Sequence, residues 1–349
     1  MSIEKLSRLK NRVKYGANLK KPRYMLRLGR NLVQRYFFGR RPLRGIDFAI
    51  DYACNLRCQH CFNKDITPGA RRMQFADYQR VYREAEQEGI LNFCFQGGEF
   101  MALPTWPRYL EMLDAGKFSL SVTTNGTYLG PENIEKLVAL GVNTLTVSLD
   151  SGLAKEHDTF RGVEGTFERA VEGVLRAKSA GLRVVINSTI TPASMRSEGF
   201  LRLIEFAYRE DFLLNTIFAA PSGNWIGCQE IVMKPDDIAY YNNLRREYNN
   251  VTRDIHSLYL GHGCPGVNES IYISPYGDVF GCAYIHIRLG NIFEESLKEI
   301  RAKGMPFFNY QKKCMAAENL DFIKEYNEIV DGKQLPLDFD AHHKIKSWK

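Results

Sequence analysis

The chain has 349 residues, of which 44% are hydrophobic and 25% charged, and these are ordinary values for a globular protein. This composition excludes disordered and fibrous classes, and no stretch approaches the roughly 20 consecutive apolar residues of a membrane span. The formal net charge of +7 is unevenly distributed, because residues 1–45 carry 14 basic side chains against Glu4 alone and the remainder has a net charge of −6. We therefore expect a mildly acidic body with a basic arm.

The N-terminus does not have the apolar centre of a signal peptide, because Arg and Lys recur there every two to four positions. The eight cysteines are few for a disulfide-built secreted domain of this size, and their clustering is typical of metal ligation in a reducing compartment. We therefore expect a cytoplasmic protein, with peripheral attachment to the inner membrane surface as an extension of that prediction.

Residues 1–44 form the basic arm. Its apolar side chains recur at helical spacing among the basic ones, at Leu6, Leu9, Val13, Met25, Leu28, Leu32 and Tyr36. The arm is predicted to form one or two amphipathic helices. These could dock on the protein itself or on an acidic partner, or lie on an anionic membrane surface. Nucleic acid is the least favoured partner, because no nucleic-acid fold signature accompanies the charge and the body is acidic.

Over residues 45–255, short β-type runs alternate with helical patterns. The six predicted strands cover Ile46–Tyr52, Asn92–Gln96, Ser119–Thr124, Asn143–Leu149, Arg183–Thr189 and Leu213–Ala219. Several are almost wholly apolar or β-branched, as is typical of parallel strands that are covered on both faces. Helix signals lie between them, such as Pro131 at a helix start and Gly141 at its left-handed end. The series predicts an α/β fold, a partial TIM-like (β/α)6 barrel with functional residues at the carboxyl ends of its strands.

Three cysteines follow the first strand directly. Cys54, Cys58 and Cys61 form the pattern Cys-x3-Cys-x2-Cys. Three thiolates on one short loop can bind three irons of a 4Fe-4S cluster, whose usual complement is four cysteines, and this leaves one iron open. Zinc is the alternative, but zinc takes four ligands in a closed tetrahedron, and His60 lies too close to its flanking cysteines to be the natural fourth.

With this loop, the chain resembles the radical S-adenosylmethionine superfamily over roughly residues 45–300. The resemblance implies that the open iron chelates S-adenosylmethionine and that an electron from the cluster cleaves it to methionine and a 5′-deoxyadenosyl radical. This radical then abstracts a hydrogen atom from the substrate. An external electron donor of the flavodoxin or ferredoxin type is implied as well. One departure is His60, because most members have Tyr or Phe before the last cysteine.

Polar segments at the ends of the second and third strands extend the resemblance. Gly97, Gly98 and Glu99 resemble the family's Gly-Gly-Glu segment, which implies that its backbone and carboxylate hold the methionine ammonium group. Thr124 and Asn125 lie where the family makes ribose contacts. The competing interpretation is that both segments are ordinary turns.

The fourth strand and the helix after it supply three further residues. Ser148 and Asp150 end the strand and correspond to further ribose contacts, and Arg161 is expected to pair with the carboxylate of the cofactor. A guanidinium fork suits that task. The alternatives are that Asp150 caps a backbone segment and that Arg161 forms a surface ion pair.

A change of pattern after residue 255 predicts a C-terminal module over residues 256–330. Ile271–Phe280 has a hairpin signal, and Cys264, Gly277 and Cys282 give Cys-x12-Gly-x4-Cys across it. This resembles the opening of the SPASM and shorter twitch extensions, which implies an auxiliary 4Fe-4S cluster. A full SPASM module has seven cysteines, whereas only Cys314 follows Cys282 here, so the module is expected to be shortened.

Cys264, Cys282 and Cys314 are therefore three candidate ligands for one auxiliary cluster. Its fourth iron is open to substrate, or it is closed by a distant residue such as Cys228 or His286, or the module is degenerate and its cysteines are inert. The polar tail, residues 331–349, is expected to be loosely ordered.

The sequence thus predicts a radical enzyme, with a peptide or protein as the first substrate hypothesis. The alternative is a dehydrogenase or epimerase of a sugar, an aminocyclitol or a lipid-linked glycan. A hypothesis of another class is an iron-sulfur or zinc binding protein without catalysis. Cys228 follows the sixth strand on the active side, so it is a candidate hydrogen donor to a substrate radical, or else a partly buried spectator.

Overall fold

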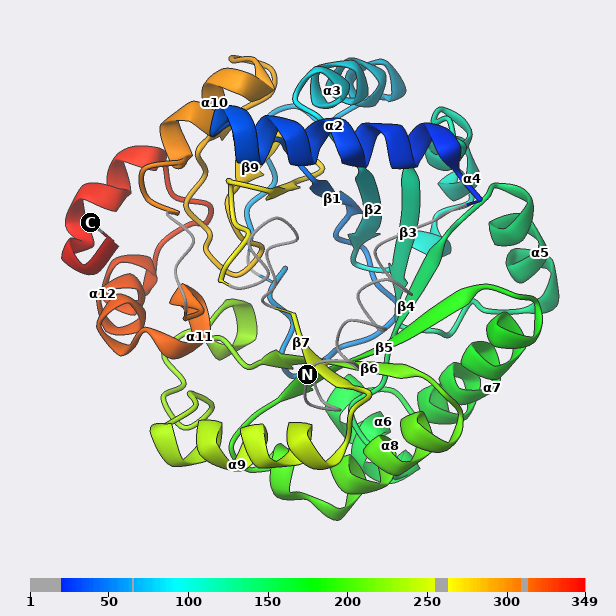
Figure 1. Cartoon of the computed structure of the whole chain (residues 1–349). Coiled ribbons are helices and arrows are strands. Elements are labelled where there is room, and N and C mark those ends of the chain that lie inside the picture. The colour runs from blue at the N-terminus through cyan, green and yellow to red at the C-terminus, as the bar shows by residue number, and fades with distance from the viewer. Residues whose placement is uncertain (1–19, 65, 255–262, 309–312, 349) are drawn as a thin grey trace.

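The computed structural model describes residues 20–64, 66–254, 263–308 and 313–348 (Figure 1). Ten strands of this part form one sheet, in the order β10-β9-β8-β1-β2-β3-β4-β5-β6-β7. The strands surround the centre of the molecule and most helices lie outside them (Figure 1). This arrangement confirms the predicted α/β class and the partial barrel.

The six predicted parallel strands all form. They are β1 (Gly45–Asp51), β2 (Asn92–Gly97), β3 (Ser119–Thr124), β4 (Thr144–Ser148), β5 (Arg183–Ile190) and β6 (Leu213–Phe218). A seventh parallel strand, β7 (Val251–Arg253), pairs with β6 and was not predicted. Side chains alternate between the two faces of each strand, so that Phe93 and Phe95 belong to the main apolar core and their neighbours face the barrel interior.

Helices and short 3-10 segments connect the strands. They are α3 (Phe75–Gln87), η1 (Phe100–Ala102), α4 (Trp106–Glu111), α5 (Pro131–Ala139), α6 (Ala154–Arg161), α7 (Thr166–Ser179), η2 (Ser194–Arg196), α8 (Glu198–Arg209), η3 (Gly223–Trp225) and α9 (Pro235–Glu247). As predicted, α5 begins at Pro131, and the chain leaves it through Gly141, whose φ of 72° is left-handed. These connections return the chain to the amino end of each next strand, so the carboxyl ends gather on the opposite side.

Helix α2 (Pro22–Phe38) is the first described helix and lies at the amino ends of β2, β3 and β4. Lys21, just before it, donates from Nζ to Phe118 O at 3.2 Å and to Asn143 Oδ1 at 2.6 Å. Asn31 is buried and donates from Nδ2 to Gly89 O at 2.6 Å. The predicted arm is therefore helical over these residues and docks on the protein itself. Residues 1–19, with the other half of the predicted amphipathic pattern, lie outside the described part.

The C-terminal region extends the same sheet. The predicted hairpin is formed by β8 (Ser270–Ile273) and β9 (Asp278–Phe280), and β8 also pairs in parallel with β1. The region continues with β10 (Gly290–Asn291), α10 (Leu297–Gly304), α11 (Met315–Glu318) and α12 (Leu320–Val330). The division into domains at residue 255 stays a prediction.

The expectation of a loosely ordered tail is wrong for the part described, which ends at residue 348. The tail contains η4 (Phe339–Lys344) and η5 (Lys346–Trp348). Trp348 is only 3% exposed, and its ring centroid lies 5.6 Å from that of Phe308 and 5.3 Å from that of Phe322. A few apolar side chains within a polar composition are enough to anchor it. Among the described helices, none is both long and apolar enough to cross a membrane.

Candidate active site

A cavity of about 510 Å³ opens at the carboxyl ends of the strands. Its wall is formed by the cysteine loop after β1, the ends of β2, β3 and β4, and the last residue of α6. The predicted site residues that line it are Cys54, Cys58, Cys61, Gly97, Gly98, Thr124, Asn125, Ser148 and Arg161. Segments spread over more than 100 positions of the sequence therefore meet in one place.

The two glycines at the end of β2 hold the start of the cysteine loop. Gly98 N donates to Asp51 O at 2.7 Å, and the next amide, from Glu99, donates to Ala53 O at 2.9 Å. A Cβ atom at Gly98 would lie 2.0 Å from Ala53 O, so no larger residue fits without moving the loop. The glycines were expected to allow a ligand to approach. In this structure the close approach is between two backbone segments of the chain.

Two further segments bind the other end of the loop. Arg57 N donates to Arg161 O at 3.1 Å, which connects the loop to the end of α6. Asn224, in η3, donates from Nδ2 to Cys58 O at 3.0 Å and from its backbone N to Cys61 O at 3.1 Å. Gly223 has a left-handed φ of 58°, and a Cβ atom there would lie 2.1 Å from Cys61 O. Sequence reasoning missed both η3 residues, although the Gly-Asn pair after the sixth strand was a local signal.

The Glu99 carboxylate is engaged inside the protein. Glu99 is 1% exposed, and its Oε1 accepts hydrogen bonds from Thr124 Oγ1 at 2.8 Å and Met101 N at 3.1 Å. Its Oε2 accepts from Asn125 N at 2.7 Å. Burial raises the pKa of Glu99, and these hydrogen bonds oppose the shift. The carboxylate thus fixes the end of β3, which positions Asn125 in the cavity wall. The predicted contact of Glu99 with an ammonium group of the cofactor stays a prediction.

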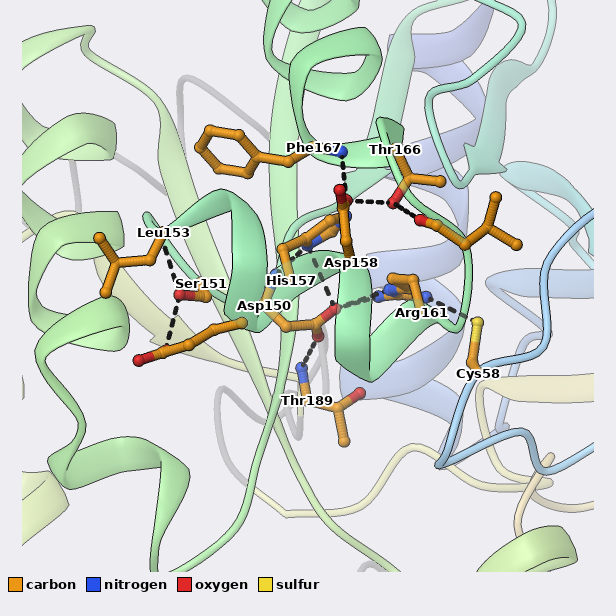
Figure 2. Close-up of polar contacts among 12 residues, drawn as sticks. Cys58, Asp150, Ser151, Leu153, His157, Asp158, Arg161, Thr166, Phe167 and Thr189 are labelled. Carbon is orange, nitrogen blue, oxygen red and sulfur yellow. Dashed lines mark hydrogen bonds and ion pairs between the residues drawn. The ribbon is translucent and has the colours of Figure 1, made fainter.

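Asp150, Arg161 and Cys58 form a buried polar chain (Figure 2). Arg161 donates from Nε and Nη2 to the same carboxylate oxygen of Asp150, at 2.7 and 2.6 Å, and its Nη1 lies 3.7 Å from Cys58 Sγ. Asp150 also accepts from Thr189 N at 3.0 Å. Burial disfavours both charges, but their mutual attraction prevails, so the pKa of Asp150 is lowered and that of Arg161 is raised. The Asp150 carboxylate is therefore engaged with Arg161, which lines the cavity, and its predicted ribose contact stays a prediction.

Two histidines beside this chain are neutral. Burial lowers the pKa of His157 to about 4, and its Nδ1 accepts from Asp150 N at 3.3 Å. Burial likewise lowers the pKa of His60 to about 3. The His60 ring stacks on Phe160 with centroids 4.8 Å apart and planes 3° from parallel, and it lines the cavity. His60 thus provides a flat uncharged ring at the position where most family members have Tyr or Phe.

The three loop thiols fit an iron-sulfur cluster. Burial raises the pKa of Cys54 to about 11 and also raises that of Cys61, so their thiolate forms need a cation for stability. Among the described residues, no three His, Cys, Asp or Glu side chains are grouped for a single metal ion. A 4Fe-4S cluster binds each thiolate through a different iron, so its ligands do not need to converge on one atom.

A second group of cysteines, partly buried, lies in the C-terminal region. Cys264 precedes β8, Cys282 follows β9 and Cys314 precedes α11. Burial raises the pKa of Cys264 to about 11 and of Cys282 to about 12, and that of Cys314 lies well above the ordinary value. Other thiols of the group raise these pKa values further, because Cys264 acts on Cys282 and both act on Cys314. Cys264, Cys282 and Cys314 stay the predicted ligands of an auxiliary cluster.

His286 and Cys228 are the two candidates for the fourth ligand of the auxiliary cluster. His286 is 2% exposed and its Nε2 lies 3.4 Å from Ser222 Oγ. Cys228 packs against a small apolar cluster of Ala219, Ile231, Val232 and Ile323. Cys228 is also not among the residues that line the cavity. Its role as a hydrogen donor stays a prediction.

Two sets of three cysteines on a partial parallel α/β barrel, one of them at the carboxyl ends of its strands, indicate an iron-sulfur protein. The Radical SAM superfamily model matches residues 50–204, and the model of SPASM, an iron-sulfur cluster-binding domain, matches residues 264–318. The chain therefore contains a radical SAM domain followed by a SPASM region. Its cofactors are a 4Fe-4S cluster and S-adenosylmethionine, with auxiliary iron-sulfur binding in the SPASM region.

Curated relatives and solved structures agree with this assignment. The chain is 28% identical to the AdoMet-dependent heme synthase of Methanosarcina barkeri over 83% of this chain and 90% of that protein. It is 24% identical to AlbA, a subtilosin biosynthesis protein of Bacillus subtilis, over 72% of this chain and 58% of that protein. SuiB of Streptococcus suis bound to its precursor peptide SuiA has a similar fold, with a TM-score of 0.60 at 18% identity, covering 85% of this chain and 76% of SuiB. The anSMEcpe structure with AdoMet and a peptide also has a TM-score of 0.60 at 18% identity, covering 88% of this chain and 96% of that chain.

Proposed function

We propose that this protein abstracts a hydrogen atom from a peptide or protein substrate and thereby modifies it. The observation that carries the radical chemistry is the single cavity that joins Cys54, Cys58 and Cys61 to the ends of β2, β3 and β4. When bound, the reduced 4Fe-4S cluster cleaves S-adenosylmethionine to methionine and a 5′-deoxyadenosyl radical. A reductant of the flavodoxin or ferredoxin type is the expected electron donor.

The residues of the chain position the cofactors. Gly98, Arg161 and Asn224 fix the cysteine loop from three sides through the hydrogen bonds described above. Asn125 and Ser148 offer polar groups on the cavity wall, where a nucleoside hydroxyl can be bound. A cysteine loop fixed from three sides keeps its thiols in place for a bound cofactor.

The inner wall of the barrel supports a substrate rich in hydrogen-bonding groups. Ile186 and Leu214 face the apolar core, so the neighbouring Asn187 and Asn215 face the barrel interior. Asn215 Nδ2 donates to Asn187 Oδ1 at 2.9 Å, and Asn187 is aligned in register with Ser148 of the cavity wall. Amide side chains can both donate to and accept from peptide groups. The similar folds solved with peptides bound support the same substrate class.

A second candidate is oxidation of a tetrapyrrole precursor. It is favoured by the relative named as a heme synthase, which this chain matches over 90% of that protein's length. An oxidation of this kind needs an acceptor for the second electron, and the auxiliary cysteines Cys264, Cys282 and Cys314 could hold one. Sugar or aminocyclitol dehydrogenation or epimerisation is the further alternative that the same experiment addresses.

The experiment is anaerobic reconstitution with iron and sulfide, followed by reduction with dithionite in the presence of S-adenosylmethionine. We expect formation of 5′-deoxyadenosine in the wild type and none in Cys58→Ala, with equal folding of both checked by circular dichroism. A reconstituted wild-type protein that forms no 5′-deoxyadenosine would leave the non-catalytic iron-sulfur protein as the correct class.

Substrate classes are then compared with deuterated candidates. Transfer of deuterium into 5′-deoxyadenosine from a peptide encoded near this protein's own gene supports the first proposal. Transfer only from a tetrapyrrole or only from a sugar supports the respective alternative and refutes the peptide. If the reaction is an epimerisation, solvent deuterium enters the product, and Cys228→Ala abolishes this incorporation only if Cys228 is the hydrogen donor.

A further inference from the structure

We propose that Arg161 sets the reduction potential of the catalytic cluster through a charge-assisted hydrogen bond to the Cys58 thiolate, and that Asp150 limits this effect by neutralising the guanidinium. The inference rests on the proposed function only in that Cys54, Cys58 and Cys61 hold a 4Fe-4S cluster. It gives Arg161 a task that exists before any S-adenosylmethionine binds.

The orientation of the guanidinium is fixed by Asp150. Nε and Nη2 of Arg161 both donate to Asp150 Oδ2, which leaves Nη1 as the nitrogen nearest to Cys58, 3.7 Å from its Sγ. Because the guanidinium is planar and rigid, two bonds on one edge determine where the third nitrogen points. Asp150 is itself fixed by Thr189 N at 3.0 Å and by its place at the end of β4 (Figure 2).

The environment makes this contact electrostatically strong. Arg161 is 6% exposed and Asp150 is 8% exposed, so water screens neither charge effectively. The guanidinium group of an arginine is always charged in a protein. The cluster ligand Cys58 therefore faces a permanent cation.

A positive donor at a cluster thiolate favours the reduced state. Reduction adds one negative charge to the cluster, and hydrogen bonds to its sulfurs stabilise that charge. Arg161 should therefore raise the potential. The carboxylate of Asp150 opposes this effect because it cancels much of the guanidinium charge. Loss of either residue should consequently shift the potential, and the two shifts should have opposite signs.

The competing role of Arg161 is the one expected from the sequence, in which it binds the carboxylate of S-adenosylmethionine. Arg161 lines the cavity, so both roles are sterically accessible to it. The two roles separate when the potential is measured without S-adenosylmethionine. A residue that only binds the cofactor weakens cofactor affinity on substitution and leaves the potential of the cofactor-free cluster unchanged.

The experiment is an electron paramagnetic resonance titration of the reconstituted full-length protein without S-adenosylmethionine. To isolate the catalytic cluster, the titration is made in a Cys264→Ala/Cys282→Ala/Cys314→Ala background. In Arg161→Gln we expect the reduction equilibrium to move at least tenfold toward the oxidised cluster, equivalent to 59 mV for one electron. In Asp150→Asn we expect a shift toward the reduced cluster. Arg202→Gln removes an exposed arginine on α8 that pairs with Glu198, and as the control it should not shift the potential.

Unchanged potentials in both variants, or shifts of the same sign, would overturn the inference, because a merely structural disturbance of the loop affects both variants alike. If Arg161→Gln binds fewer than four irons, Arg161→Lys replaces it. Lysine keeps the charge but cannot hold the two-point contact with Asp150, so a smaller shift of the same sign is expected, and no shift would refute the proposal. Clusters that load normally and cleave S-adenosylmethionine with unshifted potentials would refute this inference alone and leave the proposed function intact.

Discussion

Gly223→Ala tests whether η3 holds the cysteine loop in place. The new Cβ atom would lie 2.1 Å from the carbonyl oxygen of Cys61, whereas an ordinary contact needs at least 3.4 Å. The carbonyl must therefore move by about 1 Å, and an active-site group misplaced by roughly that distance can cost about 100-fold in rate. Alanine also pays about 1–2 kcal/mol for the left-handed backbone at this position.

Gly227→Ala is the matched control in the same loop. Gly227 is also left-handed, with a φ of 82°, but nothing lies within 4 Å of the position that an added Cβ atom would take. Gly227→Ala should lose about 1–2 kcal/mol of unfolding free energy in urea titrations, and Gly223→Ala at least as much, because it adds the clash with the Cys61 carbonyl. Only Gly223→Ala should also lose iron on anaerobic reconstitution and form 5′-deoxyadenosine about 100-fold more slowly. Equal iron content and equal rates in the two variants would refute the proposed bracing of Cys61 by Gly223.

Three further outcomes are expected. Burial lowers the pKa of His157 and of His286 from 6.5 to about 4, so the folded state keeps both side chains neutral while the unfolded chain takes up protons below pH 6.5. The free energy of unfolding should therefore fall by about 2 kcal/mol per histidine between pH 7.5 and pH 5. An unchanged urea midpoint over this range would contradict the reasoning. Cys314→Ser should lower the bound iron from about eight per chain to about four, and full retention in iron analysis would remove Cys314 from the ligand set. Trp348→Ala should cost about 3–5 kcal/mol in urea unfolding, whereas Lys346→Ala should change the stability by less than about 0.5 kcal/mol, and equal effects would argue against an anchored tail.

Local patterns in the sequence were sufficient for the barrel strands. Runs such as Leu145–Leu149 contain apolar and β-branched residues that form strands wherever both faces are covered, so each predicted strand lies within two residues of the observed one. The meeting of the cysteine loop with the polar strand ends was predictable once the strands were placed, because a parallel topology brings all their carboxyl ends to one side. The three residues of β7 are too few to give a periodic signal.

Contacts between distant segments could not be predicted from local patterns. Asn224 binds the Cys58 carbonyl across 166 positions of the chain, and nothing near Asn224 indicates that partner. The ion pair between Asp150 and Arg161 is a second example, because a strand-end position does not specify which helix residue a side chain will meet. This pair depends on how α6 returns to the barrel.

The pairing of β8 with β1 has a consequence for how the protein can be divided. One backbone edge of β1 pairs with β2, and the other edge, from Gly45 to Phe48, pairs with Ser270–Ile273, which is synthesised long after it. A fragment that ends before residue 264 would expose a row of unpaired amides and carbonyls on an apolar strand, and such an edge recruits other chains. Expression of the barrel alone should therefore give aggregates, and in a cell the nascent barrel needs protection until the SPASM region emerges. The C-terminal region, which contains Cys264, Cys282 and Cys314, thus also supplies the strand that completes the pairing of β1.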